Sequence, residues 1–175
     1  FCDNVAVHRW LVELLVENGI DRNRIAVING EVAKDAMRRL EISDKFNGVP
    51  EVVAPDGTIE VEAIAPAFDI VIANQAAYEG IDLHRRTCLV YHLDLPWEPS
   101  TLRQRNGRAV RQGNLESNVT IRFLMARRSL DVVRYEYILG KLRWMTDLIS
   151  SSDNSLSNPA ADSEIDSESL VLFMS

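Results

Sequence analysis

Hydrophobic residues recur along this chain with two periods, one typical of helices and one typical of buried strands. Apolar positions three and four residues apart predict helices over Val5–Asn18, Glu31–Phe46 and Leu130–Ile149. Short apolar runs predict strands over Arg24–Asn29, Phe68–Ala73, Thr87–Leu93 and Val119–Ala126, and Phe1–Asn4 is typical of the end of another buried strand. This alternation predicts an α/β domain with a mostly parallel sheet covered by helices on both faces.

One region interrupts the alternation. The runs Glu51–Ala54 and Thr58–Ala63 flank Pro55-Asp56-Gly57, which is typical of a hairpin turn. We therefore expect an inserted β-hairpin within residues 50–63, at an edge or on the surface of the domain.

Length and composition predict one domain with a tail. The 175 residues divide into a domain over residues 1–149 and an acidic, serine-rich linker or tail over residues 150–175. No apolar run approaches the ~18 residues of a membrane helix, so we expect no membrane partner. The chain opens without Met inside a strand-like segment, which predicts a fragment of a longer protein.

The cysteines and histidines suggest structural positions rather than chemistry. Cys2 and Cys88 lie in apolar, strand-like sequence and are expected to be buried reduced thiols, which favours a cytoplasmic location. The histidines lack metal-ligand spacing, so no metal site is expected. We expect His8 on a helix surface and His92 as a hydrogen-bonded core residue.

Charge is distributed unevenly. The net charge is -7, yet residues 103–143 hold ten Lys/Arg against three acids, whereas residues 150–175 hold five acids and no base. Because phosphate binding depends on the local field, the basic stretch predicts an anionic partner despite the total.

An arginine-rich segment carries the strongest chemical signal. A helix is predicted from an N-cap at Ser100 to Gly113, and it would place Gln104, Arg108 and Arg111 on one face. Two guanidiniums and a carboxamide on one face are suited to clustered phosphate oxygens. A glycine inside a helix costs about 1 kcal/mol, so Gly107 is expected to have a packing or functional reason.

A second candidate segment follows the strand Phe68–Ala73. Ligands of parallel α/β sheets collect at the carboxyl ends of strands. Within Asn74–Leu83, Gly80 would let the backbone approach a ligand, and Asp82 could accept a hydrogen bond from a ribose hydroxyl. The chain contains no Walker A loop and no assembled nucleophile, so these residues amount to half of an ATP site.

The run Gln104–Arg111 resembles motif VI of superfamily-two helicases, whose pattern is Q-x-x-G-R-x-x-R. Residues 93–114 are similar to the Swi/Snf-type branch, and its bacterial RNA-polymerase-associated members are nearest. Further resemblances are Asn74–Leu83 to motif V, Phe1–Asn4 to the end of motif IV, and Ile25–Gly30 with Arg38 or Arg39 to the strand and helix that follow motif IV. The motifs occur in the family's order over about residues 1–149.

The resemblance implies a three-layer RecA-like fold of the P-loop NTPase type, and this chain would be the second of two such domains. Arg108 and Arg111 would be arginine fingers that reach the γ-phosphate, a role worth roughly 10³–10⁵ in rate elsewhere. Gly80 and Asp82 would touch nucleotide, and Gln104 would lie near the phosphates. ATP with Mg would be bound mainly by the N-terminal RecA-like domain, which would supply the Walker lysine and the acids.

The implied function is the second motor domain of an ATP-dependent DNA helicase or translocase, with double-stranded DNA as the track. The isolated chain would hydrolyse nothing. Asn114 stands where the Swi/Snf branch usually has Gln, and Glu98 stands where it usually has Asn. The domain could therefore also belong to a restriction-enzyme or phage-type helicase.

Two other functions are compatible with such a sheet. One is a non-catalytic module that docks nucleic acid or protein, which the presence of all four residues Gly80, Asp82, Arg108 and Arg111 disfavours. The other is a dinucleotide or nucleotide-sugar enzyme, which the lack of a G-x-G-x-x-G turn disfavours.

Overall fold

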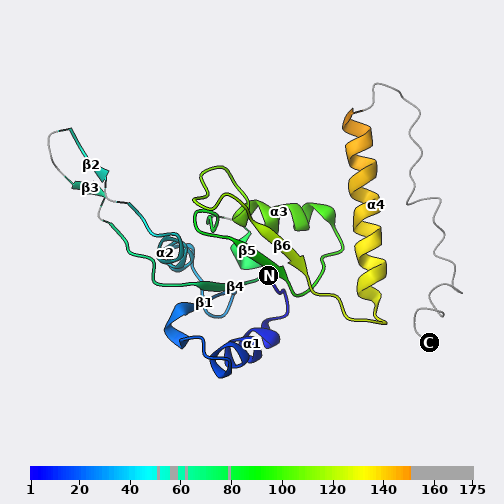
Figure 1. The fold of residues 1–175 in the computed structure, drawn as a ribbon, viewed down its shortest axis with the longest axis horizontal. Helices are drawn as coiled ribbons and strands as arrows, with labels where there is room; N and C mark the ends of the chain where they lie inside the picture. The colour runs from blue at the N-terminus through cyan, green and yellow to red at the C-terminus, as the bar shows by residue number, and fades with distance from the viewer. Residues whose placement is uncertain (51, 56–58, 62, 79, 151–175) are drawn as a thin grey trace, which may run out of the picture. The chain divides into compact units, whose positions relative to one another are not determined.

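The computed structural model describes residues 1–50, 52–55, 59–61, 63–78 and 80–150 (Figure 1). Its helices are α1 (Val5–Glu17), α2 (Ala36–Asn47), α3 (Pro99–Ala109) and α4 (Leu130–Ser150), with short 3-10 turns η1 (Arg22–Arg24) and η2 (Gln75–Ala77). Its strands are β1 (Ile25–Ile28), β2 (Val52–Val53), β3 (Ile59–Val61), β4 (Ile70–Ala73), β5 (Leu89–His92) and β6 (Thr120–Phe123). The predicted tail, residues 151–175, lies outside the described residues.

The chain forms two compact units. The first comprises Phe1–His92 with Gln104–Arg122, and the second comprises Leu93–Arg103 with the part of the chain from Phe123 onward. Helix α3 contributes its beginning to the second unit and its end to the first.

The first unit is layered as predicted. Strands β1 and β4 pair in parallel, with Ile25 opposite Ile70 and Ile28 opposite Ala73. Alternate residues of these strands pack on opposite faces, one against α1 and the other against α2, and Figure 1 shows the two helices on either side of the strands. The α/β fold class is confirmed, although the sheets of the described residues are small, with two strands each.

The first residues lie between β4 and β5. Cys2 N donates to the carbonyl of Ala73 at 2.9 Å, and the amino group of Phe1 donates to the carbonyl of Tyr91 at 2.5 Å. Phe1–Asn4 forms no strand in the structure, so the predicted strand end is not confirmed, although these two bonds place the segment beside β4 and β5.

Helix α1 follows from its capping residues. The Asn4 side chain accepts from the backbone N–H of Ala6, and at the other end Gly19 has φ +90°. Gly19 N donates to Val16 and Ile20 N to Leu15, the pair of bonds typical of a Schellman motif. The predicted helix and its terminating glycine are confirmed.

Helix α2 starts five residues later than the pattern predicts. The Asn29 side chain accepts from the backbone N–H groups of Glu31 and Val32, which keeps that segment in a turn. The Asp35 side chain then accepts from the N–H of Arg38 and caps the helix. The apolar spacing indicates a helix, whereas these local side-chain bonds set its first residue.

Two further expectations are corrected in this unit. The apolar run predicts that β5 is buried throughout, but Leu89 and Tyr91 are exposed and only alternate residues are buried. Both cysteines are free thiols, as expected, yet only Cys2 is buried and Cys88 is exposed.

The inserted hairpin is present. Strands β2 and β3 pair antiparallel, and a bridge between Val49 and Ile64 extends the pair toward the body of the unit. The turn expected at Pro55-Asp56-Gly57 lies mostly outside the described residues. Val52 and Val61, which face each other across the hairpin, are both exposed.

The second unit is built on α4. Its buried cluster joins Ile138 of α4 to Leu95 and Leu102. The Arg134 guanidinium lies 4.1 Å from the centre of the Trp97 ring and donates to the carbonyl of Leu95 at 2.8 Å. Within the described part of the chain, no helix combines the length and the apolar character needed to cross a membrane.

Candidate functional site

Asp82 is held by its backbone as well as by its side chain. Ser43 Oγ and Asn47 Nδ2, both on α2, donate to the Asp82 carbonyl at 2.5 and 2.7 Å. Gly80, two residues earlier, has φ +74°, a conformation in which other residues are strained. The turn at Gly80 therefore delivers Asp82 to a fixed position at the end of α2.

Both predicted arginines converge on this segment. Arg111 Nη1 lies 2.6 Å from Asp82 Oδ1, and Arg108 Nη1 lies 3.7 Å from the same oxygen. Arg108 also donates to the carbonyl of Ile81 at 2.9 Å, and Leu83 N donates to the carbonyl of Arg108 at 2.8 Å. The structure thus brings Gly80, Asp82, Arg108 and Arg111 to one place on the first unit.

The predicted helical face is corrected. Helix α3 begins at Pro99, so Ser100 lies inside it, and it ends at Ala109, so Arg111 lies beyond it. Arg111 reaches Asp82 from the following turn rather than from the helix. Gln104 remains on α3, one turn before Arg108, and its side chain is exposed.

Gly107 has no packing reason in the structure. A Cβ at this position would meet no other atom within 4 Å, and the residue is exposed on α3. Of the two reasons expected for this glycine, packing is therefore not supported, and the functional one stays a prediction.

The cluster combines two arginines, which could bind an anion, with the Asp82 carboxylate, which already pairs with them. Two guanidiniums and one carboxylate leave one positive charge in excess, and all three side chains are open to solvent, with exposed fractions of 26% for Arg108, 56% for Arg111 and 41% for Asp82. Arginine recognises phosphate through paired N–H groups. Within the described ranges, no group of three or more acids, histidines or cysteines could hold a metal ion.

Arg105 has an environment that the sequence-based prediction missed. Its side chain is 0% exposed; its Nε donates to Tyr78 Oη at 2.6 Å, and its Nη2 lies 2.6 Å from Asp3 Oδ2. Tyr78 Oη in turn donates to Asp3 Oδ1 at 3.0 Å. A signal was present, because Arg105 is in phase with the buried residues Leu102 and Ala109 on α3.

Burial also perturbs the tyrosine of this network. Loss of solvation raises the pKa of Tyr78 to about 12, although the hydrogen bond from Arg105 acts in the opposite direction. The phenol is thus held in its protonated form, in which it can donate to Asp3.

His92 follows its prediction. The side chain is fully buried at the end of β5, and its Nε2 lies 2.8 Å from Asn106 Oδ1 on α3. Its ring stacks on Phe1 with 5.8 Å between centroids. It is a hydrogen-bonded core residue.

A family model described as "Helicase conserved C-terminal domain" matches residues 11–113, more than half of the chain. The match includes the segment from Gly80 to Asp82 and both arginines. The chain belongs to the helicase conserved C-terminal domain family. Domains of this family generally bind nucleic acid and work alongside an N-terminal helicase domain.

A curated relative of this helicase domain is "Defense against restriction protein B" of Escherichia phage P1. The two are 34% identical over 111 residues, which cover 61% of this chain and 5% of that protein. The helicase domain thus corresponds to a small part of its relative's length.

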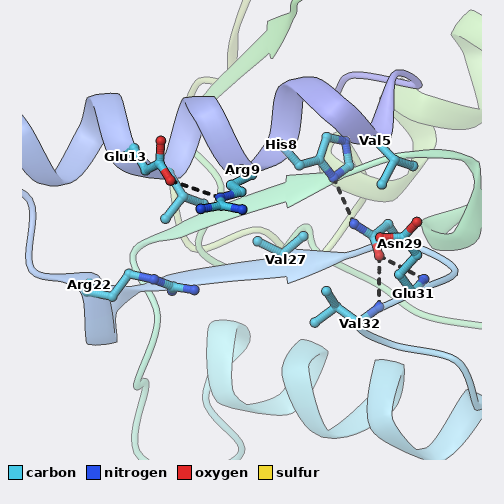
Figure 2. Close-up of a pocket in the computed structure, with 10 residues that line it drawn as sticks. Val5, His8, Arg9, Glu13, Arg22, Val27, Asn29, Glu31 and Val32 are labelled. Carbon is cyan, nitrogen blue, oxygen red and sulfur yellow. Dashed lines mark hydrogen bonds and ion pairs between the residues drawn. The ribbon is translucent and has the colours of Figure 1, made fainter.

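The helicase domain also has a pocket away from the arginine cluster (Figure 2). It has a volume of about 360 Å³ and lies between α1 and β1, beside His8 and Asn29. The prediction of His8 on the helix surface is wrong: the side chain is buried, with Nε2 2.7 Å from the carbonyl of Cys2 and Nδ1 3.1 Å from Asn29 Nδ2. Since a carbonyl only accepts, Nε2 carries the hydrogen and Nδ1 accepts from Asn29. His8 therefore fixes the end of β1 to α1.

Proposed function

We propose that this chain is the second motor domain of an ATP-dependent DNA helicase or translocase. Arg108 and Arg111 act as arginine fingers toward the γ-phosphate of ATP, which with Mg is held mainly by the N-terminal RecA-like domain. The observation that carries the proposal is the convergence of Arg108 and Arg111 on Asp82 beside Gly80, within a domain of the helicase family.

The role of each site residue follows from the part of the nucleotide that it could contact. Arg108 and Arg111 stabilise charge on the transferred phosphoryl group, because their guanidiniums are open to solvent and need only exchange a carboxylate for a phosphate. Gly80 lets the backbone approach the nucleotide, Asp82 accepts from the ribose once the phosphates engage the arginines, and the exposed Gln104 lies toward the phosphates from α3.

Double-stranded DNA and the Swi/Snf branch belong to this proposal on the strength of residues 93–114. The phage relative supports the alternative that the sequence leaves open, which is a phage-type helicase rather than a member of the Swi/Snf branch. Because the match covers 5% of that protein, it supports the motor domain and not the role that the relative's name describes.

The test is DNA-stimulated ATP hydrolysis by the full-length gene product that contains residues 1–175. Arg108→Ala and Arg111→Ala are each expected to lower kcat by roughly 10³-fold or more, since arginine fingers contribute about 10³–10⁵ in rate. Arg9→Ala is the matched control, because Arg9 is an exposed arginine that pairs only with Glu13 in the described structure. It is expected to keep full turnover.

Unchanged turnover in Arg108→Ala and Arg111→Ala would refute the finger assignment. A gene product that binds DNA but hydrolyses no ATP would instead identify a docking module with a helicase fold. The two outcomes separate the motor from its rival.

A further inference from the structure

Arg105 is an arginine of the basic segment whose side chain faces inward rather than toward a ligand. It is fully buried among Tyr78 and Asp3, whereas its neighbours in the sequence, Gln104 and Asn106, are exposed and half-buried. Burying a guanidinium costs several kcal/mol unless it is paired and hydrogen-bonded. Its bonds to Tyr78 and Asp3, at 2.6 Å each, meet that requirement, so the side chain holds parts of the first unit together.

The network joins three segments that are distant in the sequence. Asp3 precedes α1, Tyr78 follows η2 after β4, and Arg105 lies on α3. Asp3 and Arg105 are 102 residues apart, and Tyr78 and Arg105 are 27 apart. One buried guanidinium therefore ties the first-unit part of α3 to the segment before α1 and to the segment that follows β4.

Helix α3 contacts two residues that precede Asp82, namely Tyr78 and Ile81. Arg105 holds Tyr78, and Arg108, one turn further along α3, holds the carbonyl of Ile81. Between these residues Gly80 has φ +74°, with nothing within 4 Å of where a Cβ would lie. Side-chain packing therefore does not fix Gly80, and the bonds from Arg105 and Arg108 hold Tyr78 and Ile81, the described residues on either side.

We infer that Arg105 is a positioning residue that acts through Arg108: by fixing Tyr78 and Asp3 against α3, it holds Ile81 where its carbonyl orients the Arg108 guanidinium. This inference rests on the proposed function of Arg108. A finger that is displaced by about 1 Å loses much of its rate contribution, because charge stabilisation in the transition state depends on prior orientation.

The test uses the full-length gene product and a double-mutant cycle. Arg105→Lys keeps the charge but loses the planar fork that bonds Tyr78 and Asp3 together, and it is expected to lower the kcat for DNA-stimulated ATP hydrolysis by about tenfold or more, with KM for ATP changed by less than about twofold. In a chain that already carries Arg108→Ala, the same substitution is expected to cause no further loss. Arg9→Lys, an exposed control, is expected to leave kcat unchanged.

The outcomes separate the inference from the function on which it rests. Losses that multiply in the double variant would show that Arg105 contributes to the fold generally and would overturn the positioning role, as would an unchanged kcat in Arg105→Lys. An unchanged kcat in Arg108→Ala would overturn the proposed function itself. If Arg105→Lys does not fold, Tyr78→Phe, which removes only the hydroxyl that Arg105 bonds, tests the positioning role by the same cycle.

Discussion

Asp82 is the residue at which the structure and the resemblance lead to a quantitative prediction. Its position after a strand end predicts a ribose hydroxyl as the partner of its carboxylate, whereas the structure pairs it with Arg111 at 2.6 Å and places Arg108 3.7 Å away. A polyphosphate that binds these arginines must first displace the carboxylate. Asp82→Asn removes that competitor with almost no change in side-chain size.

The size of the effect follows from exposure. The Arg111 and Asp82 side chains are 56% and 41% exposed, so their ion pair is screened by water and stabilises the fold by only about 0.5–1 kcal/mol, the upper half of the range for exposed pairs. Release of a pair worth about 0.5–1 kcal/mol corresponds to a roughly two- to fivefold tighter binding of a polyanion. The free energy of unfolding should fall by less than about 1 kcal/mol.

The assay is calorimetric titration of residues 1–175 with inorganic tripolyphosphate and with ATP at low salt. Asp82→Asn is expected to bind tripolyphosphate about two- to fivefold more tightly, and the gain should shrink near about 0.5 M salt because the pair is exposed. ATP should gain less than tripolyphosphate if Asp82 also accepts from the ribose. The difference between the two ligands isolates the ribose contact.

Glu13→Gln is the matched control, since it makes the same charge change and frees one exposed arginine, Arg9, from a pair at 3.0 Å. An equal gain in Glu13→Gln would mean that net charge alone is responsible. Weaker or unchanged tripolyphosphate binding by Asp82→Asn would refute the competition between carboxylate and phosphate.

Two other predictions concern the fold of the first unit. Ile28→Ala is expected to lower the free energy of unfolding, measured with urea, by about 2–5 kcal/mol. Ile28 lies on β1 with 0% of its surface exposed and packs with residues of α2, so its truncation leaves a cavity. A change below about 1 kcal/mol would contradict that packing. The raised pKa of Tyr78, about 12, means that its stabilising effect is complete below pH ~10 and is lost as the pH rises toward about 12, since the unfolded chain releases the proton first. The free energy of unfolding of Tyr78→Phe should therefore be lower than that of the unsubstituted chain at neutral pH. Above pH ~10 it should fall less steeply with pH, with a difference in slope of up to about 1.4 kcal/mol per pH unit. Equal slopes would contradict the burial of the phenol.

The order of helices and strands was predictable because it depends on local patterns. Apolar spacing located α1, α4 and the strands, and Gly19, a residue that adopts a positive φ without strain, marked the end of α1. The boundaries were less predictable. The beginning of α2 depends on the Asn29 and Asp35 side chains, which compete locally with helix formation.

The candidate site was predictable as a set of residues and not as a geometry. Motif order identified Gly80, Asp82, Arg108 and Arg111, and the structure brings these four together. The sequence placed Arg111 on a helix, whereas its chain leaves the helix at Ala109 and turns back toward Asp82. Only the backbone held by Ser43 and Asn47 places a carboxylate where both arginines meet it.

By itself, the sequence determined the α/β class, the inserted hairpin and the helicase motifs, because each is written in residues close together along the chain. Tertiary structure decided which charged and polar groups are buried. His8 was expected on a helix surface, and Arg105, although in phase with buried residues of α3, is a charged side chain. Both are buried because their partners, Asn29 and Asp3, come from distant segments. A buried polar group is stable only where such partners converge, and that convergence exists only in the folded chain.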